Sequence, residues 1–385
     1  MKIPYALPYI DERELAEVAA TIRSHWLSRG PKTQEFEQRF AESVQAPYAV
    51  GLNACTAALH LAQLALGIGP GDEVITSPMT FVATANTILH VGATPVFVDI
   101  DPVTMNLDAE RLEAAITPRT KAVIPVHFAG YPCDMDRIRE IADRYRLKVI
   151  DDAAHAVWTE YKGRPVGSLA DITCFSFYAT KNLATGEGGM LTTADEAVAE
   201  RVRVMSLHGM SKNAWNRYSE KGTWYYEVEY PGFKYNMTDI QAAFGLTQLA
   251  KLPEMQALRT KYAGMYNDAF SPLAEKGALL LPHDDAEHRH AWHLYVLRLN
   301  EDRVSTTRDD LIEQLREAGI GTSVHFIPVP HHPCYRRLGY RPEDCPQAEK
   351  AYRACLSLPL YPGMTEEQVR YVADTVTAIV AASER

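Results

Sequence analysis

Three short segments of the chain carry residue types that could act together on a small molecule. Asp152 ends an apolar run, and a carboxylate at the end of a strand can hold a positive ring nitrogen. Lys181 precedes the glycine-rich turn 186–189, where limited solvent access would lower its pKa and make it a nucleophile. Residues 53–60 lie where a strand is expected to become a helix, and the free N–H groups of a helix N-terminus bind anions.

Each of these segments also has a plainer explanation. Asn53 or Thr56 could simply cap a helix, Asp152 could cap a helix or form a salt bridge, and a lone lysine is usually a surface residue. Together, however, a phosphate site, an acid at a strand end and a lysine 29 residues later (181 − 152) are the groups that pyridoxal phosphate requires. The lysine forms the Schiff base, the acid keeps the pyridine nitrogen protonated, and the helix N-terminus holds the phosphate.

The elements that must position these residues alternate between short apolar strands and helices of about ten residues. We expect strands at 49–52, 74–77, 94–98, 121–125, 147–150 and 172–177. This alternation is typical of βαβ units and of a mainly parallel sheet that is covered on both faces. Ligands of such sheets bind beyond the carboxyl ends of the strands, where Asp152 and Lys181 would lie.

The pattern changes near residue 250. A long amphipathic helix is expected over 253–270, with Pro253 at its start, and strands and helices in looser alternation follow it. We therefore predict two domains. Residues 1–250 would form a large α/β domain with an N-terminal arm, and residues 251–385 a smaller α+β domain.

The composition is that of a globular protein, with 46% hydrophobic and 23% charged residues among 385. The net charge of −10 (39 − 49) argues against a broad nucleic-acid surface. The longest apolar runs fall short of the roughly 18–20 residues of a membrane helix, and no signal-peptide core is visible, so we expect a cytoplasmic protein without a membrane partner. The six cysteines lack zinc-ligand spacing, so no metal site is expected.

A series of longer motifs runs nearly from end to end of the chain. It includes WLSRGP (26–31), CTAALHLA (55–62), GIGPGDEVITSPMTFVATAN (67–86), VIDDAAHA (149–156), FSFYATKNLATGEGGM (175–190), PGFKYNMTDIQAA (231–243), AWHLYVLRL (291–299) and GIGTSVHFIPV (319–329). In this order the motifs resemble the DegT/DnrJ/StrS family of PLP-dependent sugar aminotransferases. The resemblance implies the aspartate-aminotransferase fold (PLP fold type I), with a large, mainly parallel-sheet domain and a smaller C-terminal α+β domain.

The resemblance also implies how the cofactor ring is held. Lys181 would carry pyridoxal 5′-phosphate and move protons between cofactor and substrate, passing through a pyridoxamine phosphate form of the cofactor. Asp152 would pair with the ring nitrogen, Phe81 would stack on the ring face, and His155 would contact the ring region.

For the phosphate, the resemblance implies a site shared between two subunits. The backbone N–H groups of Cys55 and Thr56, the Thr56 hydroxyl and Ser176 would bind the phosphate. Asn236 would reach the cofactor phosphate of a neighbouring subunit. A homodimer with shared active sites is therefore implied.

The implied reaction is transamination of a sugar nucleotide, with Tyr178 and His325 near the sugar. The substrate would be a UDP- or dTDP-linked 4-keto hexose or pentose, and glutamate would donate the amino group and leave as 2-oxoglutarate. The product would serve lipopolysaccharide, capsule or glycan synthesis. Two alternatives keep the fold, a PLP-dependent sugar dehydratase and a non-catalytic regulatory relative. Dehydratases of the family have histidine in place of the lysine or carry an added iron–sulfur cluster; Lys181 is present and no cluster-like cysteine spacing exists, which argues against both kinds. A non-catalytic chain does not need the Schiff-base lysine, so the set of Lys181, Asp152, Thr56 and Ser176 argues against a regulatory relative.

Overall fold

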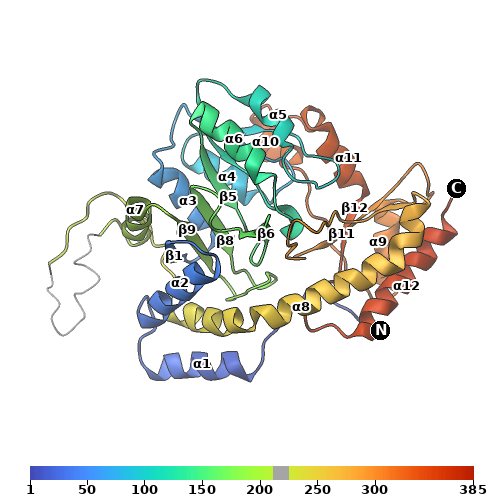
Figure 1. The fold of residues 1–385 in the computed structure, drawn as a ribbon, viewed down its shortest axis with the longest axis horizontal. Coiled ribbons are helices and arrows are strands. Elements are labelled where there is room, and N and C mark those ends of the chain that lie inside the picture. Colours follow the sequence, from blue (N-terminus) through green and yellow to red (C-terminus); the bar gives the residue numbers. More distant parts are fainter. Residues whose placement is uncertain (211–224) are drawn as a thin grey trace.

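A central seven-stranded sheet organises the first half of the chain (Figure 1). The structure is a computed structural model, and it describes residues 1–210 and 225–385. The strand order is β1-β9-β8-β5-β4-β2-β3. The strands are β1 (Tyr48–Leu52), β2 (Glu73–Thr76), β3 (Thr94–Phe97), β4 (Thr120–Ile124), β5 (Lys148–Asp152), β8 (Ile172–Ser176) and β9 (Gly189–Thr193). Neighbours from β3 to β8 pair in parallel and only β9 runs against its neighbours, so the predicted mainly parallel sheet is confirmed.

Helices cover both faces of this sheet, which explains its unbroken apolar strands. Along β4, Ala122 and Ile124 pack in a cluster with the helix that follows β1, whereas Val123 packs with the helix that precedes β5. The covering helices are α2 (Pro31–Ser43), α3 (Cys55–Ala65), α4 (Ala83–His90), α5 (Ala109–Leu112), α6 (Met135–Tyr145) and α7 (Glu196–Ser206).

A second, antiparallel sheet follows in the C-terminal part of the chain. Its strands are β10 (Leu279–Leu280), β11 (Tyr295–Leu299) and β12 (Cys355–Leu358). Around it lie α9 (Arg308–Glu317), α10 (Pro333–Arg337), α11 (Pro346–Ala354) and α12 (Glu366–Ala382). A two-stranded hairpin, β6 (Glu160–Tyr161) and β7 (Arg164–Pro165), and the 3-10 helices η1 (Glu113–Ala115), η2 (Phe128–Gly130), η4 (Val329–His331) and η5 (Pro342–Asp344) lie in the connections.

One long helix links the two sheets, and its start differs from the prediction. Helix α8 runs from Asp239 to Glu275 and contains Pro253, so the expectation of a helix that begins at Pro253 is wrong. The start signal lies earlier, because Thr238 and Gln241 form a reciprocal capping box. The predicted domain boundary at residue 250 falls inside this helix, and the division stays a prediction. Figure 1 shows α8 passing from beneath the large sheet to the second sheet.

The N-terminal arm is anchored at the second sheet before it reaches the large one. Ile3 packs in the apolar core around β11 and exchanges backbone hydrogen bonds of 2.8 Å with Gly319 and Gly321. Helix α1 (Glu12–Arg23) then packs along α8. The arm therefore passes between the two sheets, close to the cavity described below.

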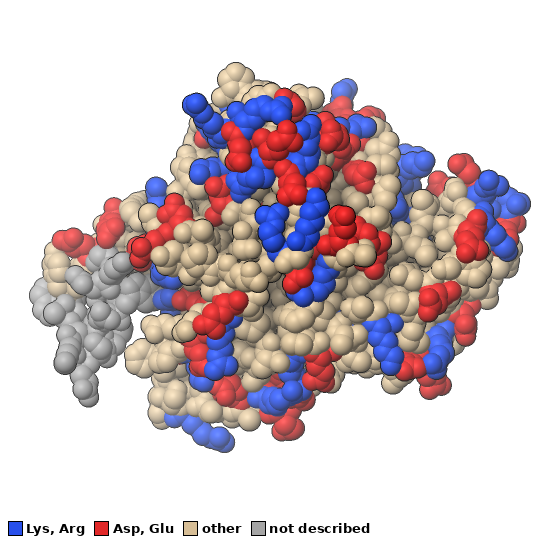
Figure 2. Space-filling model, in the orientation of Figure 1, with Lys and Arg blue, Asp and Glu red and all other residues tan. Residues whose placement is uncertain are grey.

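Charged side chains of both signs are interleaved on the face shown in Figure 2. The structure also pairs opposite charges directly, as in Arg137–Glu110 and Arg144–Glu113, each 3.0 Å between nitrogen and oxygen. The net charge of −10 is therefore not gathered into one acidic field on this face. Within the described residues, no helix combines the length and the apolar character that crossing a bilayer requires.

Candidate active site

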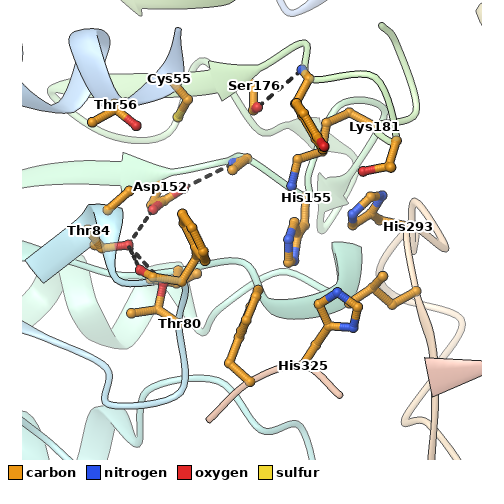
Figure 3. Close-up of a pocket in the computed structure, with 18 of the residues that line it drawn as sticks. Cys55, Thr56, Thr80, Thr84, Asp152, His155, Ser176, Lys181, His293 and His325 are labelled. Carbon is orange, nitrogen blue, oxygen red and sulfur yellow. Dashed lines mark hydrogen bonds between the residues drawn. The ribbon is translucent and has the colours of Figure 1, made fainter. Parts of the chain in front are cut away.

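A cavity of about 460 Å³ lies beyond the carboxyl ends of β5 and β8, where the second sheet and the N-terminal arm close over them (Figure 3). Nine of the ten predicted site residues line it. They are Cys55, Thr56, Phe81, Asp152, His155, Ser176, Tyr178, Lys181 and His325. The structure therefore brings together residues that are up to 270 positions apart (325 − 55).

Asp152 is the last residue of β5 and its carboxylate is fixed by two donors. Thr84 Oγ1 donates to Oδ2 at 2.7 Å, and the N–H of Ala154 donates to Oδ1 at 3.1 Å. Burial raises the pKa of Asp152, while these hydrogen bonds and the charge of Lys181 act against that rise. The carboxylate is thus oriented and largely dehydrated, as partnership with a protonated ring nitrogen requires.

Lys181 follows β8 in a tight turn in which its N–H donates to the carbonyl of Tyr178 at 2.9 Å. Burial lowers the pKa of its amine to about 8, although the charge of Asp152 opposes this shift. Within the described part of the chain, Nζ has no hydrogen-bond partner. A substantial neutral fraction near neutral pH makes this amine a nucleophile toward an aldehyde.

The N-terminus of α3 is open to an anion. Its N-cap residue, Ala54, offers no side-chain hydrogen bond, and the first backbone bond of the helix runs from Ala58 to Ala54. The N–H groups of Cys55 and Thr56 are therefore left for a ligand. Capping by Asn53 or Thr56, the plainer explanation of this segment, is wrong, because the Asn53 amide donates to the carbonyl of Lys234 instead.

Two further predicted residues stand around this open helix end and the ring space. The Ser176 side chain lies at the end of β8, and the Phe81 ring is 62% exposed although it lines the cavity. Phe81 is therefore not a core residue. An exposed aromatic ring in a cavity is suited to stacking on a planar ligand.

His155 and His325 enter the cavity from opposite sides. His155 Nδ1 accepts a hydrogen bond of 3.3 Å from the N–H of Ala129, and burial lowers its pKa well below the usual value. His325 Nδ1 lies 2.8 Å from Ser357 Oγ, and burial lowers its pKa to about 4. Tyr178 is half-exposed at the edge of the cavity. Neutral imidazoles and a phenol are suited to hydrogen bonds with hydroxyl groups.

Asn236 is the one predicted site residue that does not line this cavity. It forms a backbone bridge with Leu52, and its amide donates to the carbonyl of Met237 at 3.1 Å. Its role toward a neighbouring subunit stays a prediction.

Five of the lining residues that were not predicted from the sequence bear on the chemistry of the site. They are Tyr5, Thr80, Thr84, His293 and Phe326. A signal for Thr84 existed, since it lies three residues after Phe81 in the motif 67–86 and a helical turn brings such positions together. No signal could have found Tyr5, which reaches the cavity only because the arm is anchored at the second sheet.

Comparison with known proteins agrees with this geometry. The profile of the DegT/DnrJ/EryC1/StrS aminotransferase family matches residues 8–377. The chain belongs to this family. As a DegT/DnrJ/EryC1/StrS aminotransferase, it has the PLP fold type I, and pyridoxal phosphate is its cofactor.

Individual relatives of this aminotransferase match over almost their whole length. The spore coat polysaccharide biosynthesis protein SpsC of Bacillus subtilis is 58% identical over 386 residues, covering 99% of this chain and 98% of SpsC. Spr1654 of Streptococcus pneumoniae, assigned as a sugar aminotransferase and solved in its PLP form, has 36% identity and a TM-score of 0.92, with 99% of each chain covered. PseC of Helicobacter pylori, an aminotransferase of pseudoaminic acid biosynthesis, has 29% identity and a TM-score of 0.91, covering 99% of this chain and 100% of PseC.

The cavity of this aminotransferase fits the cofactor in three independent respects. The Lys181 side chain is half-buried and without a hydrogen bond among the described residues, the Asp152 carboxylate is fixed, and the end of α3 lacks a cap. A Cβ on Gly189 would lie 2.4 Å from the backbone carbon of Ala54, so β9 can approach this helix end only with a glycine there. The site thus provides a nucleophile, a partner for the ring nitrogen and an anion site in one cavity.

Proposed function

We propose that the protein transfers an amino group to a nucleotide-linked keto sugar, a UDP- or dTDP-linked 4-keto hexose or pentose. The names of the relatives support a sugar substrate, since SpsC is named for polysaccharide biosynthesis and PseC for pseudoaminic acid biosynthesis. The product would be an amino sugar nucleotide for lipopolysaccharide, capsule or glycan synthesis.

The observation that carries this proposal is that one cavity holds both a half-buried lysine of lowered pKa, Lys181, and a fixed carboxylate, Asp152. The bound cofactor supplies an electron sink that stabilises negative charge at the carbon losing a proton. Lys181 holds the cofactor and moves a proton, because a pKa of about 8 lets its amine both accept and return a proton near neutral pH. Asp152 keeps the ring nitrogen protonated, and the N–H groups of Cys55 and Thr56 with Ser176 bind the phosphate.

Glutamate is the proposed amino donor, and its negative charge has a consequence for the oligomeric state of the protein. The described lining of the cavity contains one lysine, Lys181, and no arginine. The two carboxylates of glutamate and the diphosphate of a sugar nucleotide need cations that this lining does not provide. We therefore include in the proposal a homodimer in which a neighbouring subunit completes the site, with Asn236 directed to the neighbour's cofactor phosphate.

The test is amination of a panel of keto sugars. Purified protein with pyridoxal phosphate and ¹⁵N-glutamate is incubated with UDP-, dTDP- and GDP-linked keto sugars, and products are identified by mass spectrometry. We expect ¹⁵N in one sugar product and release of 2-oxoglutarate. Borohydride should fix the cofactor at Lys181, and Lys181→Ala should abolish turnover. Amination of none of these sugars, or turnover by Lys181→Ala, would refute the proposal.

The shared site has its own test. Sedimentation should show a dimer, and Asn236→Ala should weaken cofactor retention without unfolding the chain. A fully active monomer would contradict the dimer but not the reaction.

A further inference from the structure

Two imidazole rings stand beside Lys181 in the cavity (Figure 3). The ring centroids of His155 and His293 are 4.4 Å apart, and both side chains are buried. His155 Nδ1 accepts the N–H of Ala129 at 3.3 Å, and a backbone N–H can only donate. In a neutral ring the proton of His155 therefore sits on Nε2, which is a hydrogen-bond donor.

Hydrogen bonds of two side-chain amides fix the tautomer of His293, and they place its ring proton on Nδ1 rather than on Nε2 as in His155. The carbonyl oxygen of Ala291 can only accept, and it receives hydrogen bonds of 2.7 Å from Asn182 Nδ2 and from Gln256 Nε2. The orientation of both amides is thereby set, and Asn182 Nδ2 also donates to Gln256 Oε1 at 3.1 Å. Asn182 Oδ1 is then the atom that lies 3.0 Å from His293 Nδ1. His293 Nδ1 must donate to it, which leaves a lone pair on Nε2.

The surroundings keep His293 uncharged. Burial lowers its pKa well below the usual value, and the titratable or charged groups that act in the same direction are His155, Lys181, Arg259 and His325. Arg259 also fixes the backbone at this place, since its Nη1 donates to the carbonyl of His293 at 3.3 Å. Both rings thus remain neutral, but Nε2 of His155 is a hydrogen-bond donor whereas Nε2 of His293 is an acceptor.

Lys181 needs an acceptor each time it carries a proton. An ammonium group has three donors and no acceptor, and Nζ has no hydrogen bond to any described residue. Of the two neighbouring rings, only that of His293 has a free lone pair. We propose that His293 is a positioning residue for Lys181: when the amine is protonated, the lysine side chain turns and its ammonium donates a hydrogen bond to His293 Nε2. This inference rests on the proton-carrying role of Lys181 in the proposed function.

The hydrogen bond would have two consequences for Lys181. It would hold the amine in the cavity after the covalent link to the cofactor is released, while the proton stays on Nζ. It would also favour the ammonium, and so raise the pKa of Lys181 against the effect of burial. Loss of the acceptor should therefore make Lys181 less basic.

The test measures the basicity of Lys181 directly and needs no turnover. The full chain is loaded with pyridoxamine phosphate, so that Nζ is not bound to the cofactor, and is labelled with trace acetic anhydride across pH. Mass spectrometry of the Lys181 peptide gives the labelling midpoint. In His293→Phe we expect the midpoint to fall by at least about half a pH unit, an about three-fold change in the ratio of ammonium to amine.

A pair of polar variants separates the acceptor from mere packing. The amide of glutamine can reach the place of Nε2, whereas that of asparagine reaches only the place of Nδ1. We expect His293→Gln to keep the wild-type midpoint and His293→Asn to behave like His293→Phe. An unchanged midpoint in His293→Phe, or equal midpoints in the two amide variants, would overturn the proposal.

Failure of this labelling test can be distinguished from failure of the proposed function. A protein that aminates none of the sugars can still show the shifted midpoint, and an active enzyme can fail to show it. If His293→Phe does not fold, as judged by thermal unfolding, the glutamine and asparagine variants decide the question alone.

Discussion

Thr84 donates its only hydroxyl proton to Asp152, with 2.7 Å between Oγ1 and Oδ2. Thr80 Oγ1 lies 2.8 Å from Thr84 Oγ1, so Thr80 must be the donor in that contact. A chain of two hydroxyls therefore ends on the carboxylate that is proposed to pair with the ring nitrogen. Because the carboxylate is buried, each donor that stabilises its charge decides the pH range in which it stays ionised.

Thr84→Val should move the acid limb of the pH–rate profile upward. Burial already raises the pKa of Asp152, and the Thr84 hydrogen bond opposes that rise, so its removal raises the pKa further. A hydrogen bond to a charged group contributes about 1.5–3 kcal/mol, which corresponds to a shift of about one to two pH units. The measurement is kcat/KM against pH between 5 and 9, with cofactor in excess.

Thr87→Val is the matched control on the same helix. Thr87 Oγ1 donates to the carbonyl of Thr84 and accepts from Gln63, and it does not contact Asp152. We expect a loss of stability but no displacement of the acid limb. Equal displacement in the two variants would mean that the Thr84 hydrogen bond does not set the charge of Asp152.

Gly189→Ala should weaken binding of pyridoxal phosphate. The added Cβ would lie 2.4 Å from Ala54 C and 2.5 Å from Cys55 N, both backbone atoms of the open end of α3. Strand β9 or the helix end must move, and the N–H groups no longer converge on the phosphate. We expect at least a roughly ten-fold higher Kd, about 1.4 kcal/mol, in a titration of apoprotein followed by absorbance.

Gly264→Ala provides the comparison for that change. Nothing lies within 4 Å of a Cβ at Gly264, which is inside α8. Alanine should stabilise this helix by about 0.5–1 kcal/mol and leave cofactor affinity unchanged. If Gly189→Ala binds the cofactor as tightly as Gly264→Ala does, the close approach at Ala54 has no part in the phosphate site.

The sequence predicted those site residues that lie at the end of a single strand or beside a recognisable turn. Asp152 comes at the end of the strand that carries Val149 and Ile150, and Lys181 precedes a glycine-rich turn, so their common edge of the sheet followed from topology. Thr84, His293 and Tyr5 were not predicted, because their roles depend on contacts between distant segments that no local sequence pattern indicates. The start of α8 was misplaced because Pro253, a residue typical of the first helical turn, was given more weight than the capping box at Thr238.

Acid should destabilise the protein through its buried histidines. Folding lowers the pKa of His325 to about 4 and of His290 to about 3, chiefly by burial, whereas unfolded histidine titrates near 6.5. Below about pH 6.5 the unfolded chain binds more protons than the folded one, so stability falls as pH falls toward 4. We expect the free energy of unfolding in guanidinium to decrease steadily over this window.

His290→Gln should reduce that sensitivity. His290 Nδ1 accepts the N–H of Trp292 at 2.8 Å and does not line the cavity, so the variant should keep the active site. One proton fewer is then taken up on unfolding, and the slope of stability against pH should fall by about 1.4 kcal/mol per pH unit near pH 5. An unchanged slope would show that His290 is already protonated in the folded protein.

Lys251→Met should strongly destabilise the chain by isolating a buried carboxylate. Lys251 Nζ lies 2.6 Å from Glu14 Oε1, and the two side chains are 0% and 1% exposed where α1 packs on α8 (Figure 1). The lysine also bonds to the carbonyl of Tyr9 at 3.1 Å. Breaking a buried pair by removing one partner typically costs about 3–5 kcal/mol, which guanidinium denaturation would measure.

The double variant Lys251→Met/Glu14→Gln identifies the cause. Glutamine is neutral, and its single oxygen can still accept from the N–H of Asp11, as Glu14 Oε2 does at 2.9 Å. Its NH2 group then faces the Gln248 amide, which donates to Glu14 Oε1 at 2.8 Å, so that hydrogen bond is lost. If the unpaired charge is what destabilises Lys251→Met, the second change should restore part of the loss, because it removes the charge and keeps the hydrogen bond to the N–H of Asp11 at the start of α1. A double variant no more stable than Lys251→Met would instead assign the loss to packing at Lys251, and the ion pair would not be what holds α1 against α8.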